Sequence, residues 1–212
     1  MRAVILFGLI LALSSGGAAC SPFEPATYDY GLSFTNTQRG GWPVWIEEVE
    51  FERGEERWRS SAGSVGGGAG TIPPQIGKVA QIGPLPVPET MWLRWFSNRT
   101  QKYYEADLVL PKDAEAQMKQ WFKRFPLKEE YGHYLNIVVG GDGEVMVWWG
   151  ISCRKDDESR CGFDACLEYR GRQMCHYYAY PLIRSARGRE AAGDPNKYST
   201  DTEQYRREGE FP

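Results

Sequence analysis

The turn Gly140-Gly141-Asp142-Gly143 is the feature of this sequence that most constrains its fold. It separates two apolar runs, residues 134–139 and 144–150, which are rich in β-branched and aromatic side chains. A turn of Gly and Asp between such runs is typical of a β-hairpin. We expect the alternating apolar residues of both runs to line the core face of a sheet: Leu135, Ile137, Val139, Val145, Val147 and Trp149.

A second hairpin is predicted upstream. Residues 90–97 form the densest apolar segment of the body, and residues 102–110 face it across Asn98-Arg99-Thr100. Together they predict the central hairpin of the fold. Aromatic residues make up 14% of the chain, and side chains of this kind favour strands and binding interfaces.

Two more strands are predicted nearer the N-terminus, at residues 28–35 and 42–51. The apolar residues of 42–51 do not keep one parity, which predicts a bulge near Glu47-Glu48. A turn at 53–56 then returns the chain through 57–59 as a hairpin partner. These segments extend the predicted antiparallel sheet structure.

One helix is predicted, at residues 112–124, directly after Pro111. Acidic residues lie near its start and basic residues near its end, as the helix dipole favours. Its apolar face packs on a sheet in our interpretation: Ala114, Met118, Trp121, Phe122 and Phe125. The predicted fold is therefore mainly β (α+β), an antiparallel β sandwich or one strongly curved sheet with one packed amphipathic helix.

Residues 60–70 are dominated by Gly and Ser, which predicts a flexible surface loop. The segment lacks the Gly-Lys-Ser/Thr ending of a phosphate-binding loop and the spacing of an esterase nucleophile turn. Its best functional interpretation is docking to a partner. The predicted contact residues are Ser64, Gly66, Gly67 and Gly68. Prolines at 73–74 and 84–88 then impose extended backbone and exclude a helix between them.

The N-terminus has the form of an export signal. Residues 1–19 comprise Arg2, an apolar run too short to span a membrane, and a small-residue stretch. Gly-Ala-Ala-Cys then resembles a bacterial lipobox, although Gly17 stands where Leu is usual, and predicts lipidation of Cys20. The alternative is an ordinary signal with a chance cysteine at the mature terminus. Ser21 favours the outer membrane by resemblance to sorted lipoproteins.

The predicted organisation after the signal is simple. Residues 20–27 form a lipidated tether, residues 28–183 a single β-rich domain, and residues 184–212 a charged tail that we expect to be disordered. The formal net charge is −3, and no basic stripe with interleaved aromatics is present. We therefore expect no nucleic-acid partner.

Four cysteines besides Cys20 predict two disulfides in an exported chain. A hairpin turning between Arg170 and Gly171 sets Cys166 opposite Cys175, which leaves Cys153 to pair with Cys161. A turn with Gly171 first would shift this register. Zinc is the rival interpretation, but the sequence contains no close Cys-x-x-Cys pair, so no metal is predicted.

We predict no catalytic residue and no cofactor. His133 and His176 are the only histidines, and neither lies near a Ser, Cys or carboxylate motif in the sequence. Both are interpreted as structural or exposed. Paired acidic residues such as Glu47-Glu48 lie in predicted strands, where neighbouring side chains point to opposite faces. Such a pair is therefore not interpreted as the two-carboxylate site of a hydrolase.

Several of these segments together resemble one family of small proteobacterial lipoproteins, which carry domain of unknown function 2931. The resemblance rests on the lipobox, Trp42-Pro43-Val44, the order Trp-Phe-Ser, Tyr-Tyr-Glu and Leu-Pro between residues 95 and 111, and the 140–148 hairpin motif. It covers residues 28–150 and leaves out the cysteine-rich segment 153–175. Some similar lipoproteins are thought to be immunity proteins that neutralise lipase effectors of type VI secretion.

The first functional hypothesis is thus a lipid-anchored binding protein on the periplasmic face of the outer membrane. Its expected partner is a protein, most plausibly a secreted lipase effector, and the membrane is engaged through the anchor at Cys20. The alternatives are a structural or assembly lipoprotein of the cell envelope and, less favoured, an enzyme built around one of the two histidines.

Overall fold

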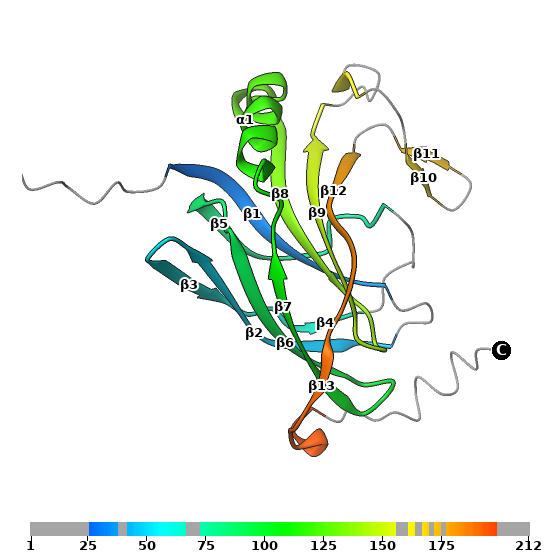
Figure 1. The fold of residues 1–212 in the computed structure, drawn as a ribbon. Coiled ribbons are helices and arrows are strands. Elements are labelled where there is room, and N and C mark those ends of the chain that lie inside the picture. Colours follow the sequence, from blue (N-terminus) through cyan, green and yellow to red (C-terminus); the bar gives the residue numbers. More distant parts are fainter. Residues whose placement is uncertain are drawn as a thin grey trace, which may run out of the picture.

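The structure is a computed structural model that describes residues 26–37, 42–66, 73–155, 161–163, 167–169, 172–174 and 177–198. Two β-sheets face each other across one hydrophobic core, and a single helix lies at one end (Figure 1). The prediction of a mainly β sandwich with one packed helix is confirmed.

The first sheet has the strand order β12-β9-β8-β1-β5. Its strands are β1 (Thr27–Asn36), β5 (Lys78–Pro86), β8 (Tyr131–Val139), β9 (Glu144–Cys153) and β12 (Tyr177–Arg187). The predicted 134–150 hairpin is confirmed as the antiparallel pair β8–β9. All neighbours are antiparallel except β1 and β8, which run parallel.

The second sheet has the order β13-β7-β6-β2-β3, and β4 also pairs with β2. Its strands are β2 (Val44–Arg53), β3 (Glu56–Ser60), β4 (Gly63–Val65), β6 (Thr90–Ser97), β7 (Lys102–Val109) and β13 (Arg189–Ala191). The predicted central hairpin is β6–β7 and the predicted bulge is the register shift between Ile46 and Glu48, so both are confirmed. A separate hairpin joins β10 (Leu167–Tyr169) and β11 (Arg172–Met174).

Alternating side chains of the two sheets fill the space between them. The core residues predicted for the 134–150 hairpin are all at most 2% exposed, which confirms their assignment. Tyr30, Leu32 and Phe34 of β1, an inner strand of the first sheet, contribute to the same core. Because the core sits between the sheets, the opposite face of each sheet remains for other contacts.

The helix α1 (Ala114–Arg124) closes one end of the core and is followed by the 3₁₀ turn η1 (Leu127–Glu129). It begins two residues later than predicted, because the Ala114 amide bonds to the carbonyl of Pro111 in a turn. Phe122 stacks on His133 with ring centroids 4.0 Å apart, and Trp121 packs on Tyr180 at 4.9 Å. The predicted apolar stripe therefore packs on the first sheet.

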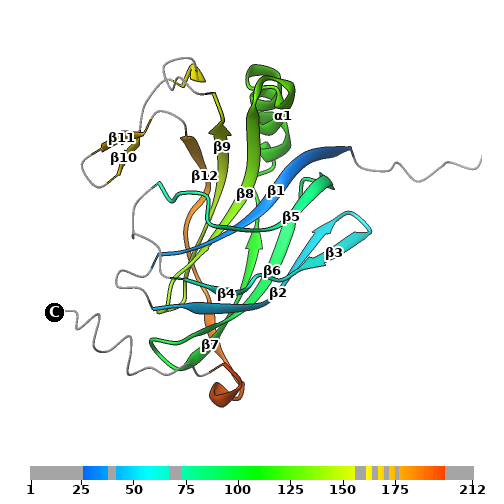
Figure 2. The ribbon, with the colours of Figure 1, turned by 180° about the vertical axis from the view of Figure 1, so that it is seen from behind.

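The chain passes from the first sheet to the second at Gly188, between β12 and β13. The Gly188 amide donates to the carbonyl of Gly143 at 2.8 Å. A side chain here would lie 2.7 Å from the Trp95 ring, so the crossover needs glycine. Figure 2 shows β3 and β5, the other two edge strands, together on one side of the sandwich.

The structure overturns two predictions about the termini of the domain. Residues 184–198, predicted to begin a disordered tail, form the end of β12, β13 and the 3₁₀ turn η3 (Pro195–Lys197). Backbone pairing with β7 and ion pairs order this segment in place of aliphatic burial. Thr27, assigned to the tether, is the first residue of β1. Residues 199–212 lie outside the described residues.

Candidate binding face on the second sheet

The loop predicted at 60–70 is ordered in its first half. Ser60 ends β3 and residues 63–65 form β4, so the prediction of a flexible loop is wrong there. Gly63 adopts φ +62°, and Val65 is 4% exposed and anchors the strand in the core. Lys78 Nζ donates to the carbonyl of Ala62 at 2.6 Å, which ties the residue before β4 to the first sheet. Burial of the Val65 side chain therefore orders this strand despite the conformational freedom of the glycines around it.

The predicted contact residue Ser64 is exposed on the outer face of the second sheet. In the sheet register Ser64 lies opposite Trp45, Trp45 opposite Phe96, and Phe96 opposite Tyr103. Directly opposed residues share a face, so these four side chains form one row across the sheet. Gly66 is exposed after β4, whereas Gly67 and Gly68 lie outside the described residues.

An ionic network lies beside this row. Arg94 Nε donates to Glu47 Oε2 at 2.6 Å, and Arg94 Nη1 pairs with Glu105. The same guanidinium lies 4.8 Å from the centroid of the Tyr103 ring. The other oxygen of Glu47 accepts from Lys197 Nζ at 2.9 Å and from the Tyr198 hydroxyl at 2.7 Å.

These contacts keep Glu47 ionised. Partial burial by itself would raise the pKa of this carboxyl. The hydrogen bonds from Tyr198, Lys197 and Arg94 outweigh burial, and the pKa of Glu47 lies below its ordinary value. A fixed negative charge therefore sits among aromatic rings on the outer face.

A C-terminal strap, residues 189–198, covers part of this face. Its first residues form β13 on the edge of β7, and its last described residue, Tyr198, stacks on Trp45 with centroids 4.6 Å apart and an interplanar angle of 16°. Phe96 and Tyr103 are 0% and 3% exposed, although they point away from the core and belong to neither hydrophobic cluster. The strap contributes to their burial, since Tyr198 packs against both rings.

We define the candidate binding face by the residues that make these contacts: Trp45, Glu47, Ser64, Arg94, Phe96 and Tyr103. Sequence reasoning found Ser64 but missed the others. A usable signal was present in residues 90–97, where Trp92, Arg94 and Phe96 alternate with the core residues Met91, Leu93 and Trp95. A strand with large side chains on both faces is expected to pack against other parts of the protein or a partner on both faces.

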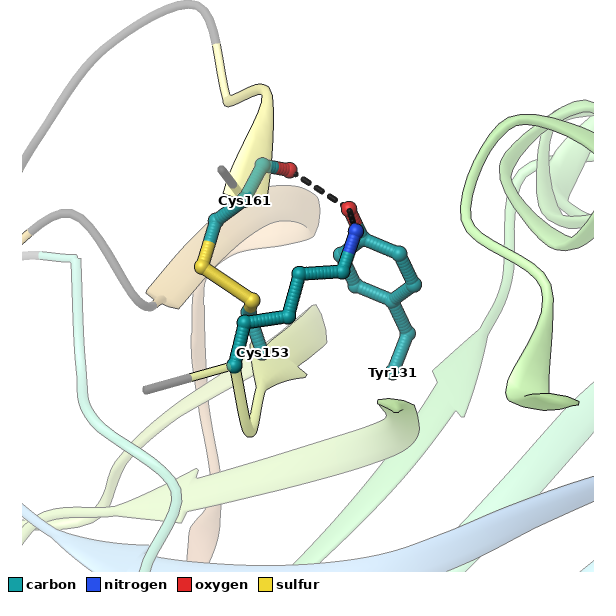
Figure 3. Close-up of a disulfide and its surroundings, with 4 residues drawn as sticks. Tyr131, Cys153 and Cys161 are labelled. Carbon is teal, nitrogen blue, oxygen red and sulfur yellow. Dashed lines mark hydrogen bonds between the residues drawn. A yellow bond between two sulfur atoms is a disulfide. The ribbon is translucent and has the colours of Figure 1, made fainter. Parts of the chain in front are cut away.

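The cysteines predicted to form disulfides are described only in part. Cys153 and Cys161 are bonded, with Cα atoms 5.9 Å apart, which confirms that pair. Figure 3 shows the Tyr131 hydroxyl beside this bridge, where it donates to the Cys161 carbonyl at 2.7 Å. Cys166 and Cys175 lie outside the described residues.

The hairpin that carries the second cysteine pair keeps the expected register. Its described residues pair Glu168 with Gln173 and Tyr169 with Arg172, as a turn between Arg170 and Gly171 requires. The alternative register is therefore wrong for β10 and β11. The bond between Cys166 and Cys175 itself stays a prediction.

His133 is a buried residue within β8. Its Nε2 lies 2.7 Å from the carbonyl of Phe125, and its Nδ1 accepts from the Trp149 indole at 3.3 Å. Burial lowers the pKa of His133 despite the bond to Phe125. A neutral ring with both nitrogens engaged is suited to a structural role.

Not all of the residues considered from the sequence are described by the structure. Cys20 and His176 lie outside the described residues. Among the residues that the structure describes, no group of three His, Cys, Asp or Glu side chains is placed to hold a metal ion. Nor does the described part include a helix long and apolar enough to cross a membrane.

The fold and this face define a class of protein: a two-sheet β sandwich whose second sheet carries a charged, aromatic outer surface under its own C-terminal segment. The chain belongs to the family of proteins of unknown function designated DUF2931, whose family model matches residues 26–209. The match includes the cysteine-rich segment, so the resemblance extends beyond the boundary at residue 150 that the sequence suggested. No curated protein and no solved structure matches the chain.

Proposed function

We propose that this protein is a lipid-anchored periplasmic binding protein, an immunity protein that neutralises a lipase effector of type VI secretion. The observation that carries the binding role is the row from Ser64 through Trp45 to Phe96 and Tyr103, with Arg94 beside it. Trp, Tyr and Arg are the residues most enriched where protein interfaces gain their affinity.

The predicted cellular location supports the same proposal. A lipid on Cys20 places the domain at the inner surface of the outer membrane, where a lipase delivered to the periplasm meets its substrate. Binding to the effector requires no reaction by the immunity protein. The predicted absence of catalytic residues is compatible with this role.

The proposal is tested in a bacterial competition assay, together with binding to any lipase-like effector that a neighbouring gene is found to encode. Ser64→Arg places a large charge in the row and is expected to abolish both protection and complex formation. Gln120→Arg makes a similar change at an exposed position of α1 and serves as the control. If the wild-type protein gives no protection, the immunity role is wrong.

The alternative, a structural lipoprotein of the envelope, predicts a different result. Deletion of the gene would weaken the envelope without any competitor present, and Ser64→Arg would not reproduce that defect. Palmitate labelling of the wild-type protein and of Cys20→Ala tests the anchor separately.

A further inference from the structure

We propose that the C-terminal strap occupies the partner's docking surface in the free protein, and that the partner presents a cation and an aromatic ring side by side, as Lys197 and Tyr198 do. The docking surface consists of Trp45, Glu47, Phe96 and Tyr103. This inference rests on the proposed binding function and specifies the site and the chemistry of the segment that binds there.

The surface under the strap is an aromatic box. The Tyr198 ring lies 4.6 Å from Trp45, 6.0 Å from Phe96 and 6.2 Å from Tyr103, measured between centroids. These rings point away from the core of the sandwich. Large aromatic side chains gathered there form the kind of surface that anchors a partner at an interface.

Glu47, at the base of this aromatic surface, favours a positively charged occupant. Glu47 Oε1 accepts from both Lys197 Nζ and the Tyr198 hydroxyl, and Oε2 is held by Arg94. Arg94 therefore fixes the carboxylate in place and leaves one oxygen for the occupant. An ionised carboxylate beside aromatic faces favours an ammonium or guanidinium group next to a ring.

The strap is attached in a way that allows it to leave. Residues 192–197 are all exposed, and only Ala191 and Tyr198 at their two ends are partly buried. Its polar contacts beyond β13 include bonds from Arg94 to the Ala192 carbonyl, at 2.5 Å, and from Tyr103 to the Asp194 carbonyl, at 2.8 Å. A segment with little apolar burial belongs to the low-stability part of a fold.

Displacement of the strap has a measurable consequence. An attached segment competes at an effective concentration of about millimolar, so a free segment of the same chemistry binds weakly until the strap is removed. The apparent affinity falls in proportion to the fraction of molecules with an open surface. Loss of the Tyr198 ring should therefore strengthen binding of a peptide that supplies it.

The experiment uses the full chain and a synthetic peptide of residues 192–198, acetylated and amidated. We expect the peptide to bind Tyr198→Ala at least about tenfold more tightly than the wild-type protein, by calorimetry or by Trp fluorescence. A peptide with Glu in place of Lys197 should not bind either protein. Trp45→Ala combined with Tyr198→Ala should lose the binding gained.

Two results would overturn the inference. One is equal binding of the peptide to the wild-type protein and Tyr198→Ala, and the other is no binding to Tyr198→Ala. Tyr198 lies outside both hydrophobic clusters, so we expect the variants to keep the sandwich intact. Cooperative thermal unfolding of each variant tests this.

The peptide measurement is independent of the competition assay. If protection by the wild-type protein fails while the peptide behaves as expected, the immunity role is wrong and the docking surface stands. If protection is present and the peptide fails either test, the docking surface is wrong and the proposed function stands.

Discussion

Each sheet carries a chain segment across its outer face, and the two segments are held by different chemistry. On the first sheet, residues 74–77 cross strands β1, β8 and β12. Asn136 donates to the carbonyl of Gln75 at 2.9 Å, and the Tyr177 hydroxyl donates to the carbonyl of Pro74 at 2.9 Å. Asn136 and Tyr177 are 0% and 4% exposed.

On the second sheet the C-terminal strap is held by charges and rings at the surface. Lys102 and Glu190, which pair at 2.6 Å, have side chains 49% and 62% exposed. Exposed pairs of this kind contribute little to stability, whereas a buried polar group left without its partner costs the full desolvation penalty. Residues 74–77 are therefore held by buried polar contacts, whereas the strap is held by exposed ones and is the easier of the two covers to displace.

The largest effect is expected from Asn136→Ala, which removes a fully buried amide that donates to the Gln75 carbonyl and accepts from the Thr35 hydroxyl. Thr35 also donates to the Gln75 carbonyl, so that acceptor keeps one partner. The free energy of unfolding should fall by about 2–3 kcal/mol, measured by urea denaturation. Asn196→Ala, at an exposed position of the strap, is the matched control and should change stability by less than about 0.5 kcal/mol. Equal losses at the two positions would remove the distinction between the covers.

Glu47→Gln is expected to have an intermediate effect. It keeps an acceptor for Tyr198 but removes the charge that pairs with Arg94 and Lys197, at a cost of about 1–2 kcal/mol. Limited proteolysis should cut the strap faster in this variant, while residues 74–77 stay protected. Unchanged cleavage of the strap would show that Glu47 does not hold it.

Acid should release the strap in the same way. Because the pKa of Glu47 is lowered in the folded protein, its contribution to stability is complete above the ordinary value of 4.5 and is lost as pH falls through the lowered pKa. Burial raises the pKa of Tyr177, and Asn136 does not titrate, so the first cover carries no such dependence. Hydrogen exchange at pH 7 and below pH 4 tests this contrast, and equal loosening of both covers would contradict it.

The smallest effect is expected from Lys102→Ala. It removes the exposed pair with Glu190 and should leave stability almost unchanged, with no gain in binding of the 192–198 peptide. Thermal denaturation and calorimetry measure both. A large loss of stability would show that surface ion pairs order β13 more strongly than this comparison allows.

Local pairing explains what could be predicted from the sequence. The hairpins β6–β7 and β8–β9 follow from short turns and alternating residues, and the apolar stripe of α1 follows from its spacing. The pairing of β1 with β8, in contrast, joins Gly31 to Tyr134 across about half of the chain, and the periodicity of a strand does not identify so distant a partner. Proline placed residues 84–86 in extended backbone, but only the edge of the first sheet can accommodate them as part of β5.

The candidate binding face was less predictable for a related reason. Ser64 was singled out by its glycine-rich surroundings, whereas Trp45, Glu47 and Arg94 gain meaning only when β2 and β6 pair and the strap returns to them. Composition alone suggested a disordered tail after residue 183. The Arg189 side chain, paired with Asp107 at 2.7 Å, shows how an edge can order a polar segment.

The crossover at Gly188 implies an order in which the two sheets are completed during folding. Arg189 meets Glu105 across a sequence separation of 84 residues, so the edge of β7 stays open until the C-terminal end of the chain reaches it. An open strand edge is a template for pairing with other chains. Since β12 leads directly into β13, completing the first sheet delivers the segment that closes the second, and truncation before Gly188 should yield a protein prone to self-association.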